Sequence, residues 1–310
     1  MSLTEEQLIQ RQSYNLDIKI FKTKQVIRQF YDKNDGQVYI SYSGGKDSEV
    51  MRHLVKELYP DVKAVFVDTG TEHKTREHAN KKADVVIRPK KTMYEVWKKY
   101  GIPFPSKQQA NYLYKINNTK SDYLKSRLMT GIMKDGSKTM FKLSKKWKPL
   151  LDTDFKFSER CCYYLKKEPL KRYGKESGCK PFIGTMASDG FERKKMYKQH
   201  GCIDIKRDYC YPLGFWTEQD ILKYLKSNNI EYCDAYGDII ENNGYFKTTK
   251  AKRTGCEGCC FGVHLEKSPN RFERMAKEDP QRHNAILNVW LDGSIGKIMK
   301  MYNIPTGEDK

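Results

Sequence analysis

Three observations predict an α/β fold in which a parallel sheet is flanked by helices. Residues 38–42 form an apolar, β-branched run that ends at two glycines, and a segment of helical spacing follows at once. The same strand-then-helix order recurs at 62–67 and 72–82, and a third strand is predicted at 84–88. The second strand ends in a polar Asp-Thr-Gly loop, which suits the carboxyl edge of a parallel sheet, where ligands bind. The alternation implies right-handed crossovers and a Rossmann-like arrangement.

The central stretch of the chain is 38–48. Its glycine turn at 43–45 lets backbone N–H groups approach an anion without interference from side chains. Lys46 adds a full positive charge, Asp47 is a candidate ligand for a magnesium ion, and Asp47 or Ser48 is expected to cap the following helix. Strand, turn and helix N-terminus together predict an anion site. Two glycines after a strand are by themselves equally typical of an ordinary loop.

The remaining segments are assigned in chain order. Helices are predicted over 4–31, most of 92–133, 162–173, 217–225 and the region around 280–291, and a fourth strand at 181–185. Thr217 followed by Asp220 forms a near capping box. The lysine-rich stretch 134–158 has no clear periodicity, and we expect it to be an exposed insertion near the nucleotide.

These assignments suggest three segments. We expect N-terminal helices in 1–34, a nucleotide-binding α/β domain in 35–240 that carries the basic insertion 134–158, and a cysteine-containing, helical segment in 241–310. A chain of 310 residues is long enough for one large domain or two smaller ones.

The composition points to a polyanionic partner. The formal net charge is +19, with 58 Lys and Arg against 39 Asp and Glu, which favours DNA or RNA. Solvated lysines without a partner are the alternative. The apolar runs are too short to cross a bilayer, so no membrane association is expected. The polar start predicts no signal peptide and a cytoplasmic protein, in which nine cysteines indicate metal or redox chemistry.

Five cysteines fall in two groups that suit a metal centre. Cys161 and Cys162 are adjacent, and Cys256 and Cys259 form a Cys-x-x-Cys pair in a glycine-rich loop. Two such pairs supply four thiolates, as zinc or an iron–sulfur cluster requires, and spacing alone does not separate these two options. Cys260 is a spare thiol, and the scattered cysteines are expected to be buried.

Four or five ordered blocks resemble a known family. The string Ser-Gly-Gly-Lys-Asp-Ser at 43–48 resembles the PP-loop of the ATP pyrophosphatases and of the phosphoadenosine phosphosulfate (PAPS) reductase family. The segment 161–170 resembles the double-cysteine motif of the cluster-containing sulfonucleotide reductases, and 253–259 resembles an Arg-Thr-Gly-Cys-x-x-Cys segment of their relatives. With further blocks at 184–193 and 212–220, the resemblance covers about 38–262.

The resemblance implies specific residues and cofactors. It implies ATP and Mg2+ at the loop, with Lys46 and Asp47 as catalytic residues. The implied nucleotide-binding residues are Ser43, Gly44, Gly45, Lys46, Asp47, Ser48, Asp68, Thr69, Gly70, Gly184 and Arg193. The implied ligands of a [4Fe-4S] cluster are Cys161, Cys162, Cys256 and Cys259, with zinc as the alternative.

One departure from the family shapes the functional hypothesis. The sulfonucleotide reductases carry a catalytic cysteine near the C-terminus, whereas no cysteine follows Cys260 in this sequence. We therefore expect an enzyme that cleaves ATP to AMP and pyrophosphate and activates an acceptor, expected to be nucleic acid, for sulfur transfer. DNA phosphorothioation and tRNA thiolation sulfurtransferases are similar proteins, and a cysteine desulfurase would be a sulfur donor. The alternatives are an APS or PAPS reductase releasing sulfite, with Cys260 as nucleophile, and a non-catalytic nucleotide-binding subunit of a nucleic acid modification or defence complex.

Overall fold

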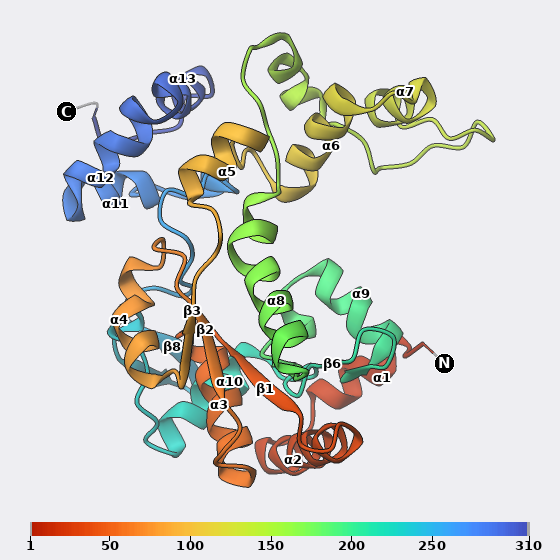
Figure 1. Cartoon of the computed structure of the whole chain (residues 1–310), viewed down its shortest axis with the longest axis vertical. Helices are drawn as coiled ribbons and strands as arrows, with labels where there is room; N and C mark the ends of the chain where they lie inside the picture. Colours follow the sequence, from red (N-terminus) through yellow and green to blue (C-terminus); the bar gives the residue numbers. More distant parts are fainter. Residues whose placement is uncertain (1, 309–310) are drawn as a thin grey trace. The chain divides into compact units, whose positions relative to one another are not determined.

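The computed structural model describes residues 2–308, which form two compact units, each assembled from two separate stretches of chain (Figure 1). Unit 1 comprises Met1–Pro89 and Glu168–Gly255, and unit 2 comprises Lys90–Lys167 and Cys256–Lys310. This division cuts across the three segments expected from the sequence. Local patterns do not reveal that the stretch after Lys90 and the C-terminal stretch share one core.

Within the described part of unit 1, a six-stranded sheet has the order β3-β2-β1-β4-β6-β5. The strands are β1 (Val38–Tyr42), β2 (Ala64–Val67), β3 (Val85–Ile87), β4 (Lys180–Ile183), β5 (Ile203–Asp204) and β6 (Tyr209–Cys210). All neighbours pair in parallel except β5, which runs antiparallel to β6 at the edge. The predicted α/β class is therefore confirmed, with the short strands β5 and β6 added.

Helices cover both faces of this sheet. They are α1 (Glu5–Gln12), α2 (Leu16–Lys33), α3 (Lys46–Leu58), α4 (His73–Lys82), α8 (Glu168–Ser177), α9 (Phe191–His200) and α10 (Glu218–Ser227). Ile40 of β1 lies in the same apolar core as Val50 and Leu54 of α3. Tyr39, the residue before it in the strand, packs edge-on against Tyr173 of α8. Because successive side chains of a strand point to opposite faces, α3 and α8 cover opposite sides of the sheet.

A two-stranded hairpin, which the sequence patterns did not predict, completes unit 1. Strands β7 (Ile239–Asn242) and β8 (Tyr245–Thr248) are joined by Asn243 and Gly244, both with positive φ (50° and 76°). Two such residues are typical of the tight turns that fit the twist of a hairpin. The Gln219 side chain exchanges two hydrogen bonds with the backbone of Phe246 (2.8 and 2.9 Å), which fastens the hairpin to α10.

Unit 2 is helical. Its helices are α5 (Met93–Tyr100), α6 (Lys107–Asn118), α7 (Asp122–Thr130), α11 (Arg271–Glu278), α12 (Pro280–Asn284) and α13 (Ser294–Met301), with tighter or wider turns at Lys145–Asp152, Tyr163–Lys167, Val263–Leu265, Ala285–Val289 and Trp290–Gly293. Trp97 of α5 and Ile298 of α13 lie in one apolar core. No helix among residues 2–308 combines the length and the apolar character needed to span a membrane.

The expected exposure of 134–158 is wrong for four of its apolar residues, whereas Met140 and Phe141 are exposed as expected. Leu143, Trp147, Leu150 and Phe157 are buried in the core of unit 2, while the intervening lysines reach solvent. The stretch is therefore anchored by a few large side chains. Their burial could not be predicted from the sequence, because apolar residues recur at regular intervals only in a regular helix or strand.

Candidate functional site

The predicted anion loop lies at the point where the strand order of the sheet reverses. From β1 the chain goes to β2 on one side, and β4 later adds on the other side, with Ser41 opposite Ile183. In such sheets ligands bind at this switch point, beyond the carboxyl ends of the strands. A Cβ atom on Gly184, just after β4, would lie 3.5 Å from the Asp47 carbonyl oxygen. The structure thus brings Gly184 into contact with the first turn of α3.

The turn itself requires glycine. Gly44 has a φ of +72°, and a Cβ atom there would lie 2.7 Å from Ala79 Cβ and 3.0 Å from the Thr75 carbonyl oxygen of α4. Gly45 is the N-cap of α3, so the N-cap residue supplies no side chain to that end, and the Lys46 N–H donates to the Tyr236 hydroxyl (3.3 Å). The prediction that Asp47 or Ser48 caps the helix is wrong, since α3 begins at Lys46. An uncapped N-terminus presents its first N–H groups to an anion.

We expect Gly44→Ala to lower the free energy of unfolding by about 3 kcal/mol, because it combines a left-handed backbone with a collision against α4. Gly70→Ala is the matched control. Gly70 has a φ of +73°, yet nothing described lies within 4 Å of its Cβ position, so its cost is about 1–2 kcal/mol. Urea unfolding of both variants measures the difference, and equal losses would contradict close packing of the turn on α4.

Two serine hydroxyls brace the loop from inside. Ser48 Oγ donates to the Gly45 carbonyl oxygen (2.8 Å) and lies 3.0 Å from Ser43 Oγ. The Ser43 N–H also donates to Ser48 Oγ (3.3 Å). These bonds hold the turn in one shape, and a ligand phosphate can take the place of the weaker ones.

Lys46 is buried among opposite charges. Its side chain is 4% exposed, and Nζ lies 3.3 Å from Asp47 Oδ1 and 3.4 Å from Glu218 Oε1. Nζ also lies 5.6 Å from the centre of the Tyr236 ring. Glu218, at the start of α10, pairs in addition with Lys252 (3.2 Å). The ammonium group is thus held at the loop by two carboxylates, either of which can yield to an anionic ligand.

Asp47 has an unusual electrostatic environment. Burial raises the pKa of its carboxyl; the nearby Lys46 opposes this rise, and the negative charge of Asp189 adds to it. Arg253 pairs with Asp189 at 3.1 Å. A nearby cation stabilises the charged form of a carboxyl and so opposes the rise in pKa that burial causes. This is the environment in which Asp47 can serve as a ligand for a divalent metal.

The polar loop at 68–70, which was predicted at the end of the second strand, is held by hydrogen bonds within the protein. Asp68 accepts two hydrogen bonds from Arg76 (2.8 Å each) and one from the Gly70 N–H (3.1 Å). Burial raises the pKa of Asp68, but these bonds outweigh burial and lower it below its usual range. Thr69 Oγ1 donates to Glu72 at 2.6 Å. The loop lies beside the glycine turn, since β2 pairs with β1, but its carboxylate is held by Arg76.

Arg193 is placed less favourably than the other predicted residues. It is exposed on α9 and donates to the Asp189 carbonyl oxygen at 3.3 Å. The Asp189 carboxylate also accepts from the Met186 N–H (3.0 Å). Arg193 is therefore linked to the site through Asp189, whose carboxylate is the group that influences Asp47.

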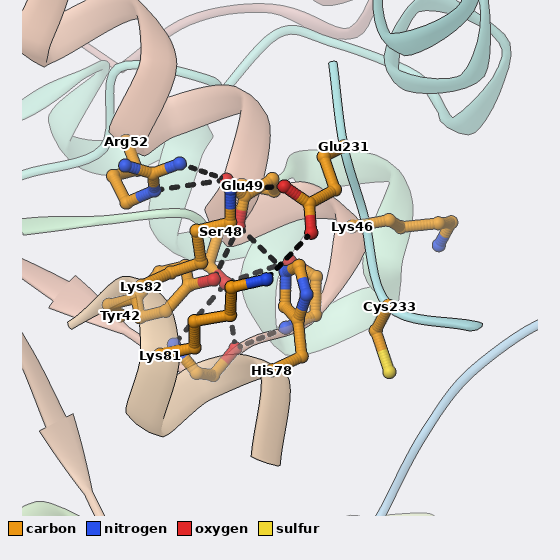
Figure 2. Close-up of polar contacts among 12 residues, drawn as sticks. Tyr42, Lys46, Ser48, Glu49, Arg52, His78, Lys81, Lys82, Glu231 and Cys233 are labelled. Carbon is orange, nitrogen blue, oxygen red and sulfur yellow. Dashed lines mark hydrogen bonds and ion pairs between the residues drawn. The ribbon is translucent and has the colours of Figure 1, made fainter. Parts of the chain in front are cut away.

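A buried polar network stands behind the loop on the same helix. Glu49 is fully buried and accepts hydrogen bonds from Tyr42 and Arg52, with Arg52 Nε at 3.0 Å and His78 Nε2 at 3.4 Å (Figure 2). Figure 2 shows Lys46 projecting away from this network. The network ties β1, α3 and α4 together and so fixes the direction in which the first turn of α3 points.

Sequence reasoning missed several residues that line the loop. The Lys46 N–H donates to the Tyr236 hydroxyl (3.3 Å), which lies 3.0 Å from Thr254 Oγ1. Glu218 and Lys252 were missed as well. Thr254 belongs to the Arg-Thr-Gly string singled out for its cysteines, and Glu218 lies inside the predicted capping box. Tyr236 carries no local signal.

The paired cysteines of unit 2 interact with one another. A hydrogen bond to Cys162, burial and the nearby Cys259 and Cys256 raise the pKa of Cys161, and the hydrogen bond from Cys161 lowers the pKa of Cys162. Burial and the charge of Cys256 raise the pKa of Cys259 to about 11. Cys161 therefore lies within electrostatic reach of the other three sulfurs. Four thiols are the donor set that zinc and iron–sulfur clusters use, although residues 2–308 contain no preformed group of three metal-ligating side chains.

The Cys-x-x-Cys loop is firmly anchored. Gly258 has a φ of +71°, and a Cβ atom there would lie 2.6 Å from Ile286 Cδ1. Arg271 donates to the Cys259 carbonyl oxygen (2.8 Å), and Arg282 pairs with Glu257 (3.2 Å). These contacts fix the backbone that carries Cys256 and Cys259.

Cys260 is no nucleophile in this structure. Its side chain is 0% exposed in the core of unit 2, and its sulfur contacts the Gly258 carbonyl oxygen (3.5 Å). Burial raises the pKa of the Cys260 thiol well above its usual range. A thiol that solvent and substrate do not reach, and that stays protonated, does not attack a sulfonucleotide.

Comparison with known proteins places the chain in a family. The phosphoadenosine phosphosulfate reductase domain model matches residues 37–144 and 116–259. The uncharacterized protein MJ0973 of Methanocaldococcus jannaschii is 32% identical over 282 residues, or 87% of this chain and 51% of that protein, so the chain spans about half the length of that relative. The U34-tRNA thiolase NcsA from Methanococcus maripaludis, solved with its [4Fe-4S] cluster, is similar over 95% of this chain and 83% of that one, at 15% identity and a TM-score of 0.35. So low a score leaves the thiolase activity a property of that protein alone. The family match covers most of the sequence and includes the glycine loop and all four paired cysteines, and the chain belongs to the phosphoadenosine phosphosulfate reductase domain family.

Proposed function

We propose that this protein cleaves ATP to AMP and pyrophosphate in order to activate an acceptor, most simply a nucleic acid base, for sulfur transfer. The observation that supports this most directly is the uncapped N-terminus of α3 at the switch point, with Lys46 and Asp47 in its first turn. Such a site suits the phosphates of a nucleotide.

Each residue of the loop has a distinct role in this proposal. The backbone of 43–45 and the first turn of α3 bind the β- and γ-phosphates. Lys46 neutralises the negative charge that develops on the pyrophosphate as it leaves. Asp47 would hold Mg2+, which when bound offsets phosphate charge. Asp68 positions the neighbouring loop on the adenosine side, because its carboxylate is already held by Arg76.

The proposed chemistry balances without an added oxidant. The acceptor carbonyl oxygen attacks the α-phosphorus of ATP, the bond to the β-phosphate oxygen breaks, and pyrophosphate leaves. A sulfur donor at the level of hydrosulfide then attacks the activated carbon. The carbon–oxygen bond breaks, AMP departs with the oxygen, and loss of a proton leaves a thiocarbonyl. No net oxidation or reduction occurs.

The cysteine group fits a cluster in this scheme. Cys161, Cys162, Cys256 and Cys259 would hold a [4Fe-4S] cluster, with zinc as the alternative. Because these four thiolates would take one iron each, sulfide would bind the cluster only by replacing one of them. This chain's own contribution is to bring thiols from two distant stretches of sequence together and to anchor their loop through Arg271.

Reduction of APS or PAPS is the less favoured function. It needs a thiol that can reach the sulfur of the nucleotide, and the spare thiol Cys260 is buried in the core of unit 2. We therefore expect little or no sulfite from either sulfonucleotide in the presence of thioredoxin.

The test is product analysis on anaerobically purified protein. We expect AMP and pyrophosphate from ATP when RNA or DNA is present, and we expect Lys46→Ala and Asp47→Ala to weaken ATP binding about tenfold to hundredfold, since each removes a charged interaction of about 1.5–3 kcal/mol. Lys24→Ala, which removes a surface pair with Glu57 on the same unit, is the control. Unchanged ATP affinity in both loop variants, measured by calorimetry, would remove the loop from the site. Robust sulfite formation would favour the reductase.

A further inference from the structure

Four tyrosines gather beside the paired cysteines in unit 2. This tyrosine cluster consists of Tyr100, Tyr114, Tyr163 and Tyr164. The rings of Tyr100 and Tyr164 stack with centres 4.7 Å apart and planes 11° from parallel, and Tyr100 donates a hydrogen bond to the Tyr164 hydroxyl at 2.7 Å. Tyr163 stands edge-on to Tyr164 at 5.2 Å. Tyr163 and Tyr164 directly follow Cys161 and Cys162 in the chain.

Positive charges surround these rings. The Arg160 guanidinium lies 5.4 Å from the centre of the Tyr100 ring and 4.7 Å from that of Tyr114. Lys91 lies 5.6 Å from the Tyr100 ring and 5.1 Å from the Tyr164 ring, and Lys99 lies 5.6 Å from Tyr100. Each cation is thus within the distance at which aromatic rings attract positive charge.

The tyrosine cluster reaches solvent, unlike the apolar core of the same unit. Tyr163 is 42% exposed, and its neighbours Tyr100, Tyr114 and Tyr164 are half-buried, whereas Trp97 is 1% exposed. Tyr100 and Tyr164 pack in part against this core, yet all four tyrosines keep part of their surface exposed to solvent.

The same stretch of chain carries most of the protein's net positive charge. Residues 90–167 contain nineteen Lys and Arg against six Asp and Glu, while residues 256–310 contain eight of each. About two thirds of the net charge of +19 therefore comes from one quarter of the chain. A solvated lysine surface without a partner would not need this charge to gather around aromatic rings.

We infer that the tyrosine cluster binds unpaired bases of a single-stranded nucleic acid, while Lys91, Lys99 and Arg160 contact its phosphates. Every base has an aromatic face that can stack on a tyrosine, and only an unpaired base can leave its own stack to do so. The inference rests on the proposed function, for which it specifies the acceptor as an unpaired segment held next to Cys161 and Cys162.

The test is binding of the full-length protein, without ATP, to a fluorescein-labelled oligonucleotide of about 12 nucleotides, in single-stranded and in duplex form. We expect the single strand to bind more tightly. Tyr100→Leu and Tyr164→Leu should each weaken its binding roughly 5- to 150-fold, as loss of one stacked base does. Tyr100→Phe and Tyr164→Phe should stay within about twofold, because the ring is kept and only the hydroxyl is lost.

Two further variants separate stacking from charge. Lys99→Ala should lower the slope of log affinity against log salt by about one, as loss of one phosphate contact does. Tyr245→Leu is the control, since this tyrosine is 58% exposed on the hairpin of unit 1 and lies outside the cluster. Thermal unfolding followed by circular dichroism identifies any variant that fails to fold, in which case the phenylalanine variants and Lys99→Ala carry the test.

The outcomes distinguish this inference from the proposed function. Equal affinity for single strand and duplex, unchanged affinity in both leucine variants, or equally effective competition by polyglutamate would overturn the inference. Binding that follows the expected pattern without any AMP formation would leave the tyrosine cluster as a nucleic acid site and overturn the proposed ATP chemistry. AMP formation that needs no nucleic acid would contradict only the nucleic acid acceptor that both assume.

Discussion

Serine in place of Cys161, Cys162, Cys256 or Cys259 is expected to abolish iron binding by anaerobically purified protein. The unmodified protein should be brown and contain about four irons per chain. A serine hydroxyl is a much poorer ligand for iron than a thiolate, so each single change should remove the cluster rather than weaken it. Iron analysis and visible absorption measure the loss.

Two other cysteines serve as controls for this experiment. Cys179→Ser, in unit 1, should keep its iron, and Cys260→Ala should keep it as well, because Cys260 is buried in the apolar core with its sulfur on the Gly258 carbonyl oxygen. A colourless protein with one zinc per chain would refute the cluster and support a zinc site. Loss of iron in Cys260→Ala with retention in Cys259→Ser would reassign the fourth ligand.

Glu49→Gln is expected to lower the free energy of unfolding by about 3–5 kcal/mol, the usual cost of removing one partner from a buried charged network. Glutamine has nearly the shape of glutamate, yet its amide is neutral and has one acceptor oxygen where Glu49 uses two, one for Arg52 and one for Tyr42. Urea unfolding followed by fluorescence measures the change. Glu57→Gln on the same helix is the matched control: its pair with Lys24 is exposed and is worth about 1 kcal/mol or less.

Glu49 is also expected to make the stability of the protein depend on pH. Burial raises the pKa of Glu49, but the hydrogen bonds from His78, Arg52 and Tyr42 outweigh burial and lower it below 4.5. A carboxyl with a lowered pKa stabilises the fold fully above its unfolded-state value, and this contribution is lost as the pH falls through the folded-state value. The unmodified protein should therefore lose stability below about pH 4.5 more steeply than Glu49→Gln. If the free energies of unfolding of the two proteins change with pH in the same way, the pKa of Glu49 does not differ between the folded and unfolded states.

Local signals in the sequence were enough to predict the centre of unit 1. The alternation in 38–42, the glycine turn and the helical spacing after it identify β1, the loop and α3. The pair Thr217 and Asp220 forms the expected capping box, with the Thr217 N–H donating to Asp220 at 2.7 Å. Each of these features depends on residues within a few positions of one another, so the sequence displays them directly.

Local sequence patterns could not predict the contacts between distant stretches of the chain. Tyr236 reaches the Lys46 N–H across 190 residues, and no local pattern distinguishes this tyrosine from the others. The start of α3 was misplaced because a glycine N-cap leaves no side-chain signature. Trp147 looked like part of a basic, exposed insertion, yet it packs edge-on against Phe104, whose place in the fold depends on the C-terminal stretch as well.

The division of unit 2 into two stretches has a consequence for synthesis on the ribosome. The core of this unit includes Trp97 and Leu113 from the first stretch and Phe272 and Ile298 from the second. At the usual rate of translation, Cys259 emerges roughly 5–20 s after Cys162. During this interval the apolar side chains of the first stretch lack the partners that they have in the folded core. The core of unit 2 therefore completes only after the second stretch has been made, and the yield of native protein depends on the first stretch avoiding aggregation until then.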